Sequence, residues 1–413
     1  MWLKQLLLHF MKSQNQCCMF NSLLLQNDVQ QFIKEHLNTA MDKLALKGSP
    51  FDGINSPELL EQIQSKNKCN KKLPLWFITA GLYYPSKLNI EQTSSEISAR
   101  YKSQLVHGKT LLDLTGGFGV DSFYFSKIVR TVTHCEIDPF LSKIAKHNFK
   151  IFGVENVKTI AVDGLEYLTQ NEENFDWIYV DPSRRDSNKN KRFFIEDCTP
   201  NVAEHLPLFF KYAAKVIIKL SPMLDIHAAL KALPHTKEIH VVAIKNEVKE
   251  LLFVLERDFD MKPEIKAINL ETNQPDFQFK ISDEVETIVD YENPLKYLYE
   301  PNAAVLKSGA FRSITSHFDL YKLGQHTHLY TSSELKKEFP GKIYIIKRAL
   351  PYHKKKLKSQ LSGQKANVKT RNFSESISQL KKRFKIKDGG DDFLIFTTSE
   401  KIKWTLECII YNH

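Results

Sequence analysis

The sequence predicts an α/β protein built on a doubly wound, mainly parallel sheet of seven strands, with a helical region before the sheet and a small α+β domain after it. Three observations support this fold class. Seven short runs of aliphatic and β-branched residues between positions 106 and 258 are mostly separated by segments long enough for crossover helices. A glycine-rich turn follows the first run directly. Basic residues are concentrated near the end of the chain.

Length and composition exclude several classes of protein. The chain has 413 residues, of which 42% are hydrophobic and 26% charged, which excludes a disordered chain and indicates two or three folded domains. The most apolar stretch, residues 206–220, is interrupted by Lys211 and Lys215, so no membrane span is expected. The six cysteines show no zinc-ligand spacing, so we expect no structural metal. These features favour a cytoplasmic protein.

The first hundred residues are expected to be mainly helical. Residues 1–18 differ in character from the residues after them, which leaves open that they are a non-native extension and that the natural chain starts at Met19. Within the helical region 19–105, helices are expected to begin near Asn27 and Ser56, where capping residues precede apolar residues at helical spacing.

The segment 106–258 carries the strands of the predicted sheet. The expected strands are residues 111–114, 131–137, 157–162, 177–181, 215–220, 238–244 and 251–256. Helices over 139–149 and 200–213 are expected to cross between parallel neighbours. Only six residues separate the last two strands, so they must form an antiparallel hairpin, which we place at the edge of the sheet.

The rest of the chain divides into a less periodic linking region, residues 259–338, and a basic α+β domain, residues 339–413, with a split βαβ layout. In the basic domain we expect a strand, a basic helix over 352–361, a second strand, a second helix and two final strands. Gly389 and Gly390 are expected to form the hairpin turn between the final strands.

Positive charge is strongly segregated along the chain. The net charge is +10, yet residues 342–387 alone contain 15 Lys and Arg against a single acid, Glu375. Two basic runs in this segment fall on separate predicted helices: Lys354, Lys355 and Lys356 on one, and Lys381, Lys382 and Arg383 on the other. Such segregation is typical of a surface that binds a polyanion. A solvated basic face that maintains solubility is the alternative.

The glycine-rich turn, LLDLTGGFGVD over residues 111–121, carries the main functional signal. Glycine allows the backbone to approach a ligand where a strand ends and a helix begins. A tight turn without a ligand is the alternative, but Asp113 at the strand end then has no structural role. The phosphate-binding motif GxxxxGK[ST] is absent, and GxGxxG fails because Ser122 replaces its third glycine. An acid before the glycines favours a cationic ligand, and S-adenosylmethionine is cationic and carries no phosphate.

These residues resemble the first motif of class I S-adenosylmethionine-dependent methyltransferases, D-x-x-x-G-x-G, whose sheet is Rossmann-like. The resemblance implies that S-adenosylmethionine is the cofactor and that it is bound by the side chains or backbone of the motif residues and of the acids that end the next two strands. These residues are Asp113, Thr115, Gly117, Gly119, Glu136 for the ribose hydroxyls and Asp163 for the adenine amino group.

The resemblance extends beyond the sheet. The segments EQTSSE (91–96), DPSRR (181–185) and KLSP (219–222) resemble a bacterial group of methyltransferases with a ferredoxin-like insert and a C-terminal THUMP-like domain. It implies a ferredoxin-like part near 278–320, a THUMP-like part over 341–411, and RNA, mainly transfer RNA, as partner. Gln92 and Ser94 would then cover the cofactor.

The fourth strand ends at the position of the family's catalytic or substrate-facing motif. Asp181 is the candidate that orients or deprotonates an acceptor nitrogen. Arg184 and Arg185 are catalytic candidates that would grip a phosphate or carboxylate, or else form ion pairs that shape the loop. Ser183 and Arg184 depart from the [DNS]PP[FYW] motif of enzymes that methylate base amines. Cys198 is not expected to be a nucleophile, because its acidic neighbours raise the pKa of a thiol.

Three functions remain open. The first is an RNA methyltransferase whose basic domain docks the RNA through about six phosphate contacts. The second is a methyltransferase that acts on a small molecule or a protein. The third is an RNA-binding protein with a vestigial cofactor pocket, against which the intact Asp113, Glu136 and Asp163 argue. Beside the basic runs, Tyr352 could stack on unpaired bases, whereas Phe384 is better suited to core packing.

Overall fold

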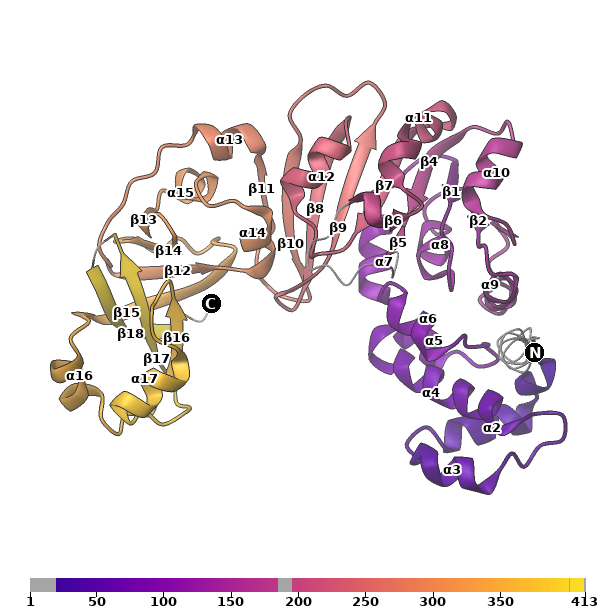
Figure 1. Ribbon diagram of the computed structural model, residues 1–413, viewed down its shortest axis with the longest axis horizontal. Coiled ribbons are helices and arrows are strands. Elements are labelled where there is room, and N and C mark those ends of the chain that lie inside the picture. The colour runs from indigo at the N-terminus through magenta and orange to yellow at the C-terminus, as the bar shows by residue number, and fades with distance from the viewer. Residues whose placement is uncertain (1–19, 185–194, 401, 412–413) are drawn as a thin grey trace, which may run out of the picture. The chain divides into compact units, whose positions relative to one another are not determined.

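The computed structural model describes residues 20–184, 195–400 and 402–411, so the extension proposed for residues 1–18 lies outside the described part (Figure 1). The chain forms two compact units. Among the described residues, the first unit comprises 20–184 and 196–218, and the second comprises residue 195 with 219–400 and 402–411.

The first unit begins with the expected helical region. Its helices are η1 (Ser22–Leu25), α2 (Asn27–Glu35), α3 (Met41–Lys47), α4 (Ser56–Lys72), α5 (Pro74–Ile78), α6 (Lys87–Gln92) and α7 (Glu96–Ser103). Helix α4 starts where expected, and Asn55 caps it by accepting a hydrogen bond from the Glu58 N–H. Trp76 is buried against Phe123, with 5.0 Å between ring centroids, so these helices share a hydrophobic core with α8 (Val120–Phe125) and α9 (Pro139–Ile151) of the first unit.

Five parallel strands form the sheet of the first unit, in the order β7-β4-β1-β2-β3. They are β1 (Thr110–Asp113), β2 (Thr131–Cys135), β3 (Val157–Ile160), β4 (Phe175–Val180) and β7 (Ala213–Leu220). The connecting helices are α8 (Val120–Phe125), α9 (Pro139–Ile151), α10 (Gly164–Gln170) and α11 (Val202–Tyr212). The doubly wound α/β fold is thus confirmed. The strand order reverses between β1 and β4, the point where such sheets bind ligands.

The second unit contains the expected hairpin, but the hairpin does not lie at the sheet edge. After α12 (Ile226–Ala232), β8 (Thr236–Ile244) and β9 (Glu247–Glu256) pair antiparallel. On the other side of β8, β10 (Glu264–Leu270) pairs in parallel, and β11 (Phe277–Lys280) pairs with β10. The sheet therefore has nine strands rather than seven. The two extra strands lie in the predicted linking region, where Pro263 and Pro275 flank β10 and bracket a strand instead of interrupting one.

The remainder of the second unit is built on a seven-stranded sheet in the order β13-β14-β12-β15-β18-β17-β16. Its strands are β12 (Tyr297–Pro301), β13 (Tyr321–Gly324), β14 (Thr327–Ser332), β15 (Gly341–Pro351), β16 (Asn367–Arg371), β17 (Asp392–Ser399) and β18 (Ile402–Ile410). The remaining helices of the second unit are α13 (Ile281–Glu286), α14 (Ala303–Ser308), α15 (Ser313–Phe318), α16 (Lys354–Leu361) and α17 (Ile377–Phe384), of which α14 contacts β8, β9 and β10 of the nine-stranded sheet. The linking region and the basic domain share this sheet, because β12 pairs antiparallel with β15.

The two adjacent glycines do not form the expected hairpin turn. Gly389 and Gly390 precede β17, with φ values of +99° and +84°, and lie against Lys365 in the loop before β16. The turn of the final hairpin instead joins Ser399 to Ile402. Glycine is favoured at these two positions, between α17 and β17, because the backbone there adopts positive φ values.

Helices α16 and α17 cover one face of this sheet. Leu357, Leu361, Leu380 and Phe384 turn inward and are buried with residues of β16 and β17. Apolar residues at helical spacing therefore fix both helices on the sheet, and their basic residues project outward. No helix in the described part of the chain is long and apolar enough to cross a bilayer.

Candidate functional site

The glycine loop joins β1 to α8 at the carboxyl edge of the first sheet. The Gly116 N–H donates to the Cys135 carbonyl at 2.8 Å, which ties the loop to the end of β2. A Cβ atom on Gly116 would lie 2.1 Å from Cε1 of His134, so only glycine fits there. Gly117 has a φ of +56°, and a Cβ atom there would meet no atom closer than 3.9 Å. Gly119, with a φ of +85°, precedes α8. The loop is thus packed at Gly116 and open at Gly117.

Asp113 is fully buried, and it has structural partners, which corrects our expectation that it has none. Ser122 Oγ donates to Oδ2 at 2.6 Å, and the Thr115 N–H donates to Oδ1 at 3.1 Å. Burial raises the pKa of Asp113 to about 7, although the hydrogen bond from Ser122 opposes this rise. Nδ1 of His134 lies 3.1 Å from Ser122 Oγ, and burial lowers the pKa of His134 to about 4. These three side chains support the loop from within the fold.

Glu136 follows β2 and lies half-buried beside the glycine loop. Its carboxylate accepts hydrogen bonds from the Gly117 N–H at 2.7 Å and the Asp138 N–H at 2.8 Å. Burial raises the pKa of Glu136, and the backbone donors act in the opposite direction. The next residue, Ile137, is 67% exposed. An acid held by the loop is therefore followed directly by an exposed apolar side chain.

Two further acids follow β3 and β4. Asp163 caps α10, and its Oδ1 accepts from the N–H groups of Leu165 and Glu166. The Asp181 N–H donates to Thr115 Oγ1 at 2.7 Å, which joins the end of β4 to the glycine loop. Because the four strands pair in parallel, the acids that follow them share one edge of the sheet. We name the loops after β1 to β4 the acidic edge.

A buried ion pair that no sequence pattern predicted lies beneath the acidic edge. Lys102 of α7 is fully buried, with its Nζ 2.8 Å from Oδ1 of Asp121 on α8. Asp121 also accepts from the hydroxyls of Tyr179 at 2.9 Å and Ser94 at 2.8 Å. Ser94, a candidate for covering the cofactor, is therefore buried in this cluster, whereas Gln92 is exposed at the end of α6. The cluster joins the helical region to the glycine loop.

The DPSRR segment enters a short antiparallel pair, β5 (Ser183–Arg184) with β6 (Cys198–Thr199). Of the two candidate arginines, Arg185 and the side chain of Arg184 lie outside the described residues. Cys198 is partly buried, and burial, then the charges of Asp197 and Asp181, raise the pKa of its thiol. The expectation of a raised thiol pKa is confirmed, which disfavours a thiolate nucleophile.

The charge of the acidic edge suits a cationic ligand. Residues 113–119, 136–138, 163–164 and 181–183 contain five acids and no Lys or Arg, and the first basic residues after β4 are Arg184 and Arg185. Gly117 leaves the backbone open at the same edge, so a ligand can approach the loop closely. In the part of the chain that the structure describes, no group of three or more His, Cys, Asp and Glu could hold a metal ion.

The basic residues of α16 and α17 form the second candidate surface, which we name the basic face. The two helices contact each other, and Lys354 and Lys355 of α16 and Arg383 of α17 lie around the same pocket. Lys355, Lys356 and Lys382 are exposed.

Three of the six candidate RNA-binding residues have acidic partners within the domain. Lys354 and Arg383 lie 3.7 and 2.7 Å from the two carboxylate oxygens of Glu375, and Lys381 pairs with Asp388. The basic face is therefore partly neutralised from within.

The two aromatic residues beside the basic runs belong to the core of the domain. Phe384 is fully buried, as expected for core packing. The ring of Tyr352 meets Phe373, Phe384 and Phe396 edge-on, and its hydroxyl donates to Glu375 at 2.7 Å. Core packing and this hydrogen bond hold the Tyr352 ring in place.

Comparison with known proteins identifies the family. A ferredoxin-like domain model matches residues 297–340, and a THUMP domain-like model matches residues 341–408. Over nearly its whole length the chain is similar to a crystal structure from Porphyromonas gingivalis W83 that is described as a methyltransferase. The two are 30% identical with a TM-score of 0.87, over 95% of this chain and 100% of that one. The chain belongs to this methyltransferase family.

Relatives of this chain are described as S-adenosylmethionine-dependent methyltransferases, which indicates the cofactor. A Mycobacterium tuberculosis H37Rv protein, described as an uncharacterized S-adenosylmethionine-dependent methyltransferase, is 22% identical over 275 residues, which are 66% of this chain and 72% of the relative. The tRNA (uracil(54)-C(5))-methyltransferase of Pyrococcus horikoshii is 30% identical over 141 residues, 34% of each chain. The protein is therefore an S-adenosylmethionine-dependent methyltransferase with a ferredoxin-like and a THUMP-like domain.

Proposed function

We propose that this methyltransferase modifies a structured RNA, such as transfer RNA, which its THUMP-like domain docks. One observation carries the proposal: the same chain combines an acidic edge for a cationic cofactor with a separate surface of clustered lysines and arginines. Clustered cations gain affinity for RNA because phosphate contacts release condensed counterions. The relative from Pyrococcus horikoshii, named as a tRNA methyltransferase, supports RNA as the class of substrate.

The proposed binding site of S-adenosylmethionine is the open side of the glycine loop, at Gly117. Glu136 would accept hydrogen bonds from the ribose hydroxyls, and the neighbouring exposed Ile137 would cover the adenine ring. Asp163 uses Oδ1 to cap α10, so Oδ2 is the oxygen proposed to accept from the adenine amino group. Asp113 is fully buried, and we therefore propose that it acts by holding Ser122 and the loop backbone in place.

The bound cofactor supplies a methyl group on a good leaving group, so the protein contributes mainly by placing the acceptor in line. We propose that Asp181 orients or deprotonates an acceptor nitrogen, because it ends β4 beside β1 and is tied to the loop by Thr115. Arg184 and Arg185 remain proposed contacts for a substrate phosphate. The raised pKa of the Cys198 thiol disfavours attack on a base carbon by this cysteine.

The test is mass spectrometry of modified nucleosides from total RNA of a deletion strain. The proposal expects one methylated nucleoside to disappear, to return with the wild-type protein, and to stay absent with Asp181→Ala. If every methylated nucleoside persists while the purified protein still binds S-adenosylmethionine, the acceptor is a small molecule or a protein. An RNA substrate would also place the enzyme in the cytoplasm.

A further inference from the structure

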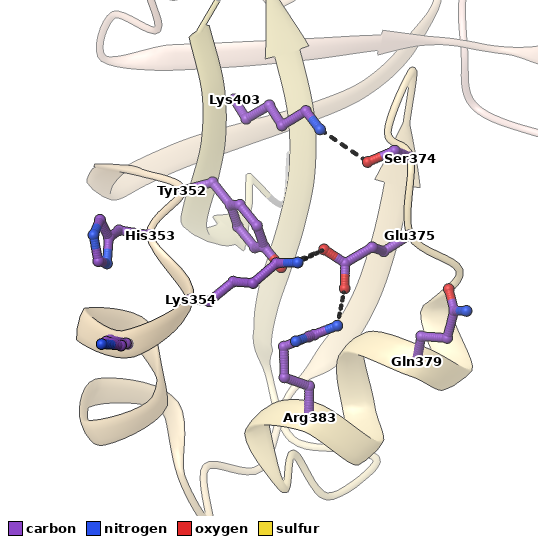
Figure 2. Close-up of a pocket in the computed structure, with 9 residues that line it drawn as sticks. Tyr352, His353, Lys354, Ser374, Glu375, Gln379, Arg383 and Lys403 are labelled. Carbon is purple, nitrogen blue, oxygen red and sulfur yellow. Dashed lines mark hydrogen bonds and ion pairs between the residues drawn. The ribbon is translucent and has the colours of Figure 1, made fainter.

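A pocket in the THUMP-like domain belongs to the second unit, whereas the acidic edge belongs to the first, and the pocket has no role in the proposed methyl transfer. Its volume is about 760 Å³, and it is lined by the start of α16, the loop before α17, one face of α17 and β18 (Figure 2). The residues that line it are Tyr352, His353, Lys354, Lys355, Ser374, Glu375, Gln379, Arg383 and Lys403. A pocket of this size is large enough for a nucleotide-sized group.

The pocket is strongly cationic around one carboxylate. Among the residues that line it, four are Lys or Arg and only Glu375 is an acid. Glu375 is also the only acid between Lys342 and Lys387, a segment with 15 basic residues. The single acid of the basic segment thus lies inside the pocket and not on the surrounding surface.

Glu375 brings side chains from two sides of the pocket to one point. Tyr352 donates to Oε1 at 2.7 Å and Lys354 lies 3.7 Å from the same oxygen, while Arg383 lies 2.7 Å from Oε2 (Figure 2). Burial raises the pKa of Glu375, but the hydrogen bond from Tyr352 and the charges of Arg383 and Lys354 outweigh it and hold the pKa below its usual value. The carboxylate therefore acts as an internal counterion for the pocket.

A third cation, Lys403, lies on another wall of the pocket. Lys403 of β18 donates to the Ser374 hydroxyl at 2.9 Å (Figure 2). Cationic donors thus come from three elements, α16, α17 and β18, rather than from one flat surface. Donors that converge from several directions suit the tetrahedral oxygens of a phosphate better than the planar carboxylate of an acidic peptide.

We infer that this pocket binds a phosphate group of RNA, and that Glu375 holds Lys354 and Arg383 in the free protein until that phosphate replaces its carboxylate. The inference rests on the proposed function, because it assumes an RNA substrate. The phosphate comes either from the end of an RNA chain, where it presents three non-bridging oxygens, or from within the chain, where it presents two; in both cases these oxygens are acceptors for the cations of the pocket.

Two substitutions with opposite expected effects test the inference. Glu375→Gln keeps an acceptor for Tyr352 but removes the competing charge, so RNA binding should tighten by about fivefold at low salt. Lys403→Ala should weaken RNA binding by about fivefold. Lys337→Ala is the matched control, because Lys337 is an exposed lysine of the second unit that lies outside the basic face and does not line the pocket, and a change within about twofold is expected.

The probe is a short single-stranded RNA with a labelled 3′ end, prepared with either a 5′-phosphate or a 5′-hydroxyl group. A preference for the 5′-phosphate that Lys403→Ala abolishes assigns the pocket to a chain end, and equal binding of both assigns it to an internal phosphate. Thermal unfolding of each variant shows whether its fold is intact.

The outcomes separate this inference from the proposed function. If the wild-type protein binds no RNA, both fail. If charge reversal at Lys354, Lys355 and Lys356 weakens RNA binding but Glu375→Gln does not tighten it, only the phosphate pocket is wrong. Equal affinity for a polyglutamate peptide at the same salt concentration would also overturn the inference, because the pocket would then not distinguish phosphate from carboxylate.

Discussion

The acidic edge of the first sheet and the basic face of the THUMP-like domain differ in how their charged groups are held. Asp113 is fully buried, and both Asp113 and Glu136 accept hydrogen bonds from backbone N–H groups. On the basic face, the side chains of Lys354 and Arg383 are 58% and 39% exposed, and their partner is another side chain. The acidic edge is fixed by the backbone, whereas the basic face is a collection of adjustable charges.

This difference sets the expected response to mutation. At the acidic edge, one side chain satisfies several backbone donors, so a single substitution leaves buried groups unpaired and costs much. On the basic face, each cation contributes little by itself, and affinity for a polyanion accumulates over many contacts. Substitution of a single hydrogen-bonded acid should therefore have a large effect in the first region, whereas in the second region single substitutions should have small effects and large ones require combined substitutions.

The largest effect is expected for Glu136→Ala. This change removes the acceptor of the Gly117 and Asp138 N–H groups and the proposed partner of the ribose hydroxyls. The affinity for S-adenosylmethionine or its demethylated product should fall by at least about 100-fold, measured by isothermal titration calorimetry. Glu155→Ala, at an exposed position of the same unit, is the control and should bind normally. If the protein bound NAD more tightly than either ligand, the proposed S-adenosylmethionine site would be wrong.

The sequence predicted the acidic edge well because its residues follow strands directly. The resemblance to class I methyltransferases singled out Asp113, Glu136 and Asp163, and in a parallel sheet residues that end or follow successive strands must meet at one edge, which places them beside Asp181.

The buried residues that hold the glycine loop in place could not be predicted in this way. Lys102, Asp121 and Tyr179 come from α7, α8 and β4, and no periodic pattern links them in the sequence. The sequence showed only that Ser122 replaces the third glycine of GxGxxG, and it did not predict that Ser122 donates a hydrogen bond to Asp113. Strands β10 and β11 were missed because short strands next to prolines lack a distinctive pattern.

The second prediction concerns the basic face and requires a combined substitution. Reversing the charge of Lys354, Lys355 and Lys356 to Glu should weaken RNA binding by about 30-fold at low salt, measured by fluorescence anisotropy. The affinity for S-adenosylmethionine should not change, because the acidic edge belongs to the other unit. The same reversal at three exposed lysines of the first unit, Lys43, Lys47 and Lys71, is the matched control.

The salt dependence of RNA binding sharpens this prediction. Six phosphate contacts would lower the affinity by roughly three orders of magnitude between about 50 and 200 mM salt. Three of the six cations already have acidic partners, so a loss of about 40-fold, which corresponds to the three remaining contacts, is expected instead. RNA binding that is insensitive to salt, or unchanged in the triple variant, would show that the basic face does not dock RNA.

A smaller effect is expected in the pH dependence of stability. Burial raises the pKa of Asp113 to about 7 and lowers that of His134 to about 4. As the pH falls from about 6.5 to about 4, the folded protein takes up a proton at Asp113, which increases its stability. Over the same range His134 is protonated only after unfolding, which decreases stability. The two contributions oppose each other in the wild-type protein.

Asp113→Asn removes the first contribution and leaves the second. Relative to the wild type, the variant should lose up to about 1.4 kcal/mol of unfolding free energy per pH unit between about pH 6.5 and pH 4. Above about pH 7, where the wild type carries a buried charge at Asp113, the variant should be the more stable of the two. Urea unfolding at several pH values measures this difference. If the unfolding free energies of the two proteins changed in parallel with pH, protonation of Asp113 would not contribute to stability.

The smallest effect is expected at Cys198, although it lies close enough to Asp181 of the acidic edge to feel its charge. The residue belongs to β6, opposite Arg184 in β5, so it is close to the proposed catalytic segment. If it attacked a base carbon, Cys198→Ser would abolish methyl transfer, because a serine hydroxyl is a far weaker nucleophile than a thiolate. Burial and the charges of Asp197 and Asp181 keep the thiol protonated, and Asp181 is the group proposed to act on the acceptor. Cys198→Ser should therefore retain methyl transfer to RNA within about twofold of wild type, whereas Asp181→Ala should lose it. If instead Cys198→Ser loses methyl transfer and Asp181→Ala retains it, the acceptor is a base carbon that Cys198 attacks. The raised pKa of the thiol would then not prevent Cys198 from acting as the nucleophile.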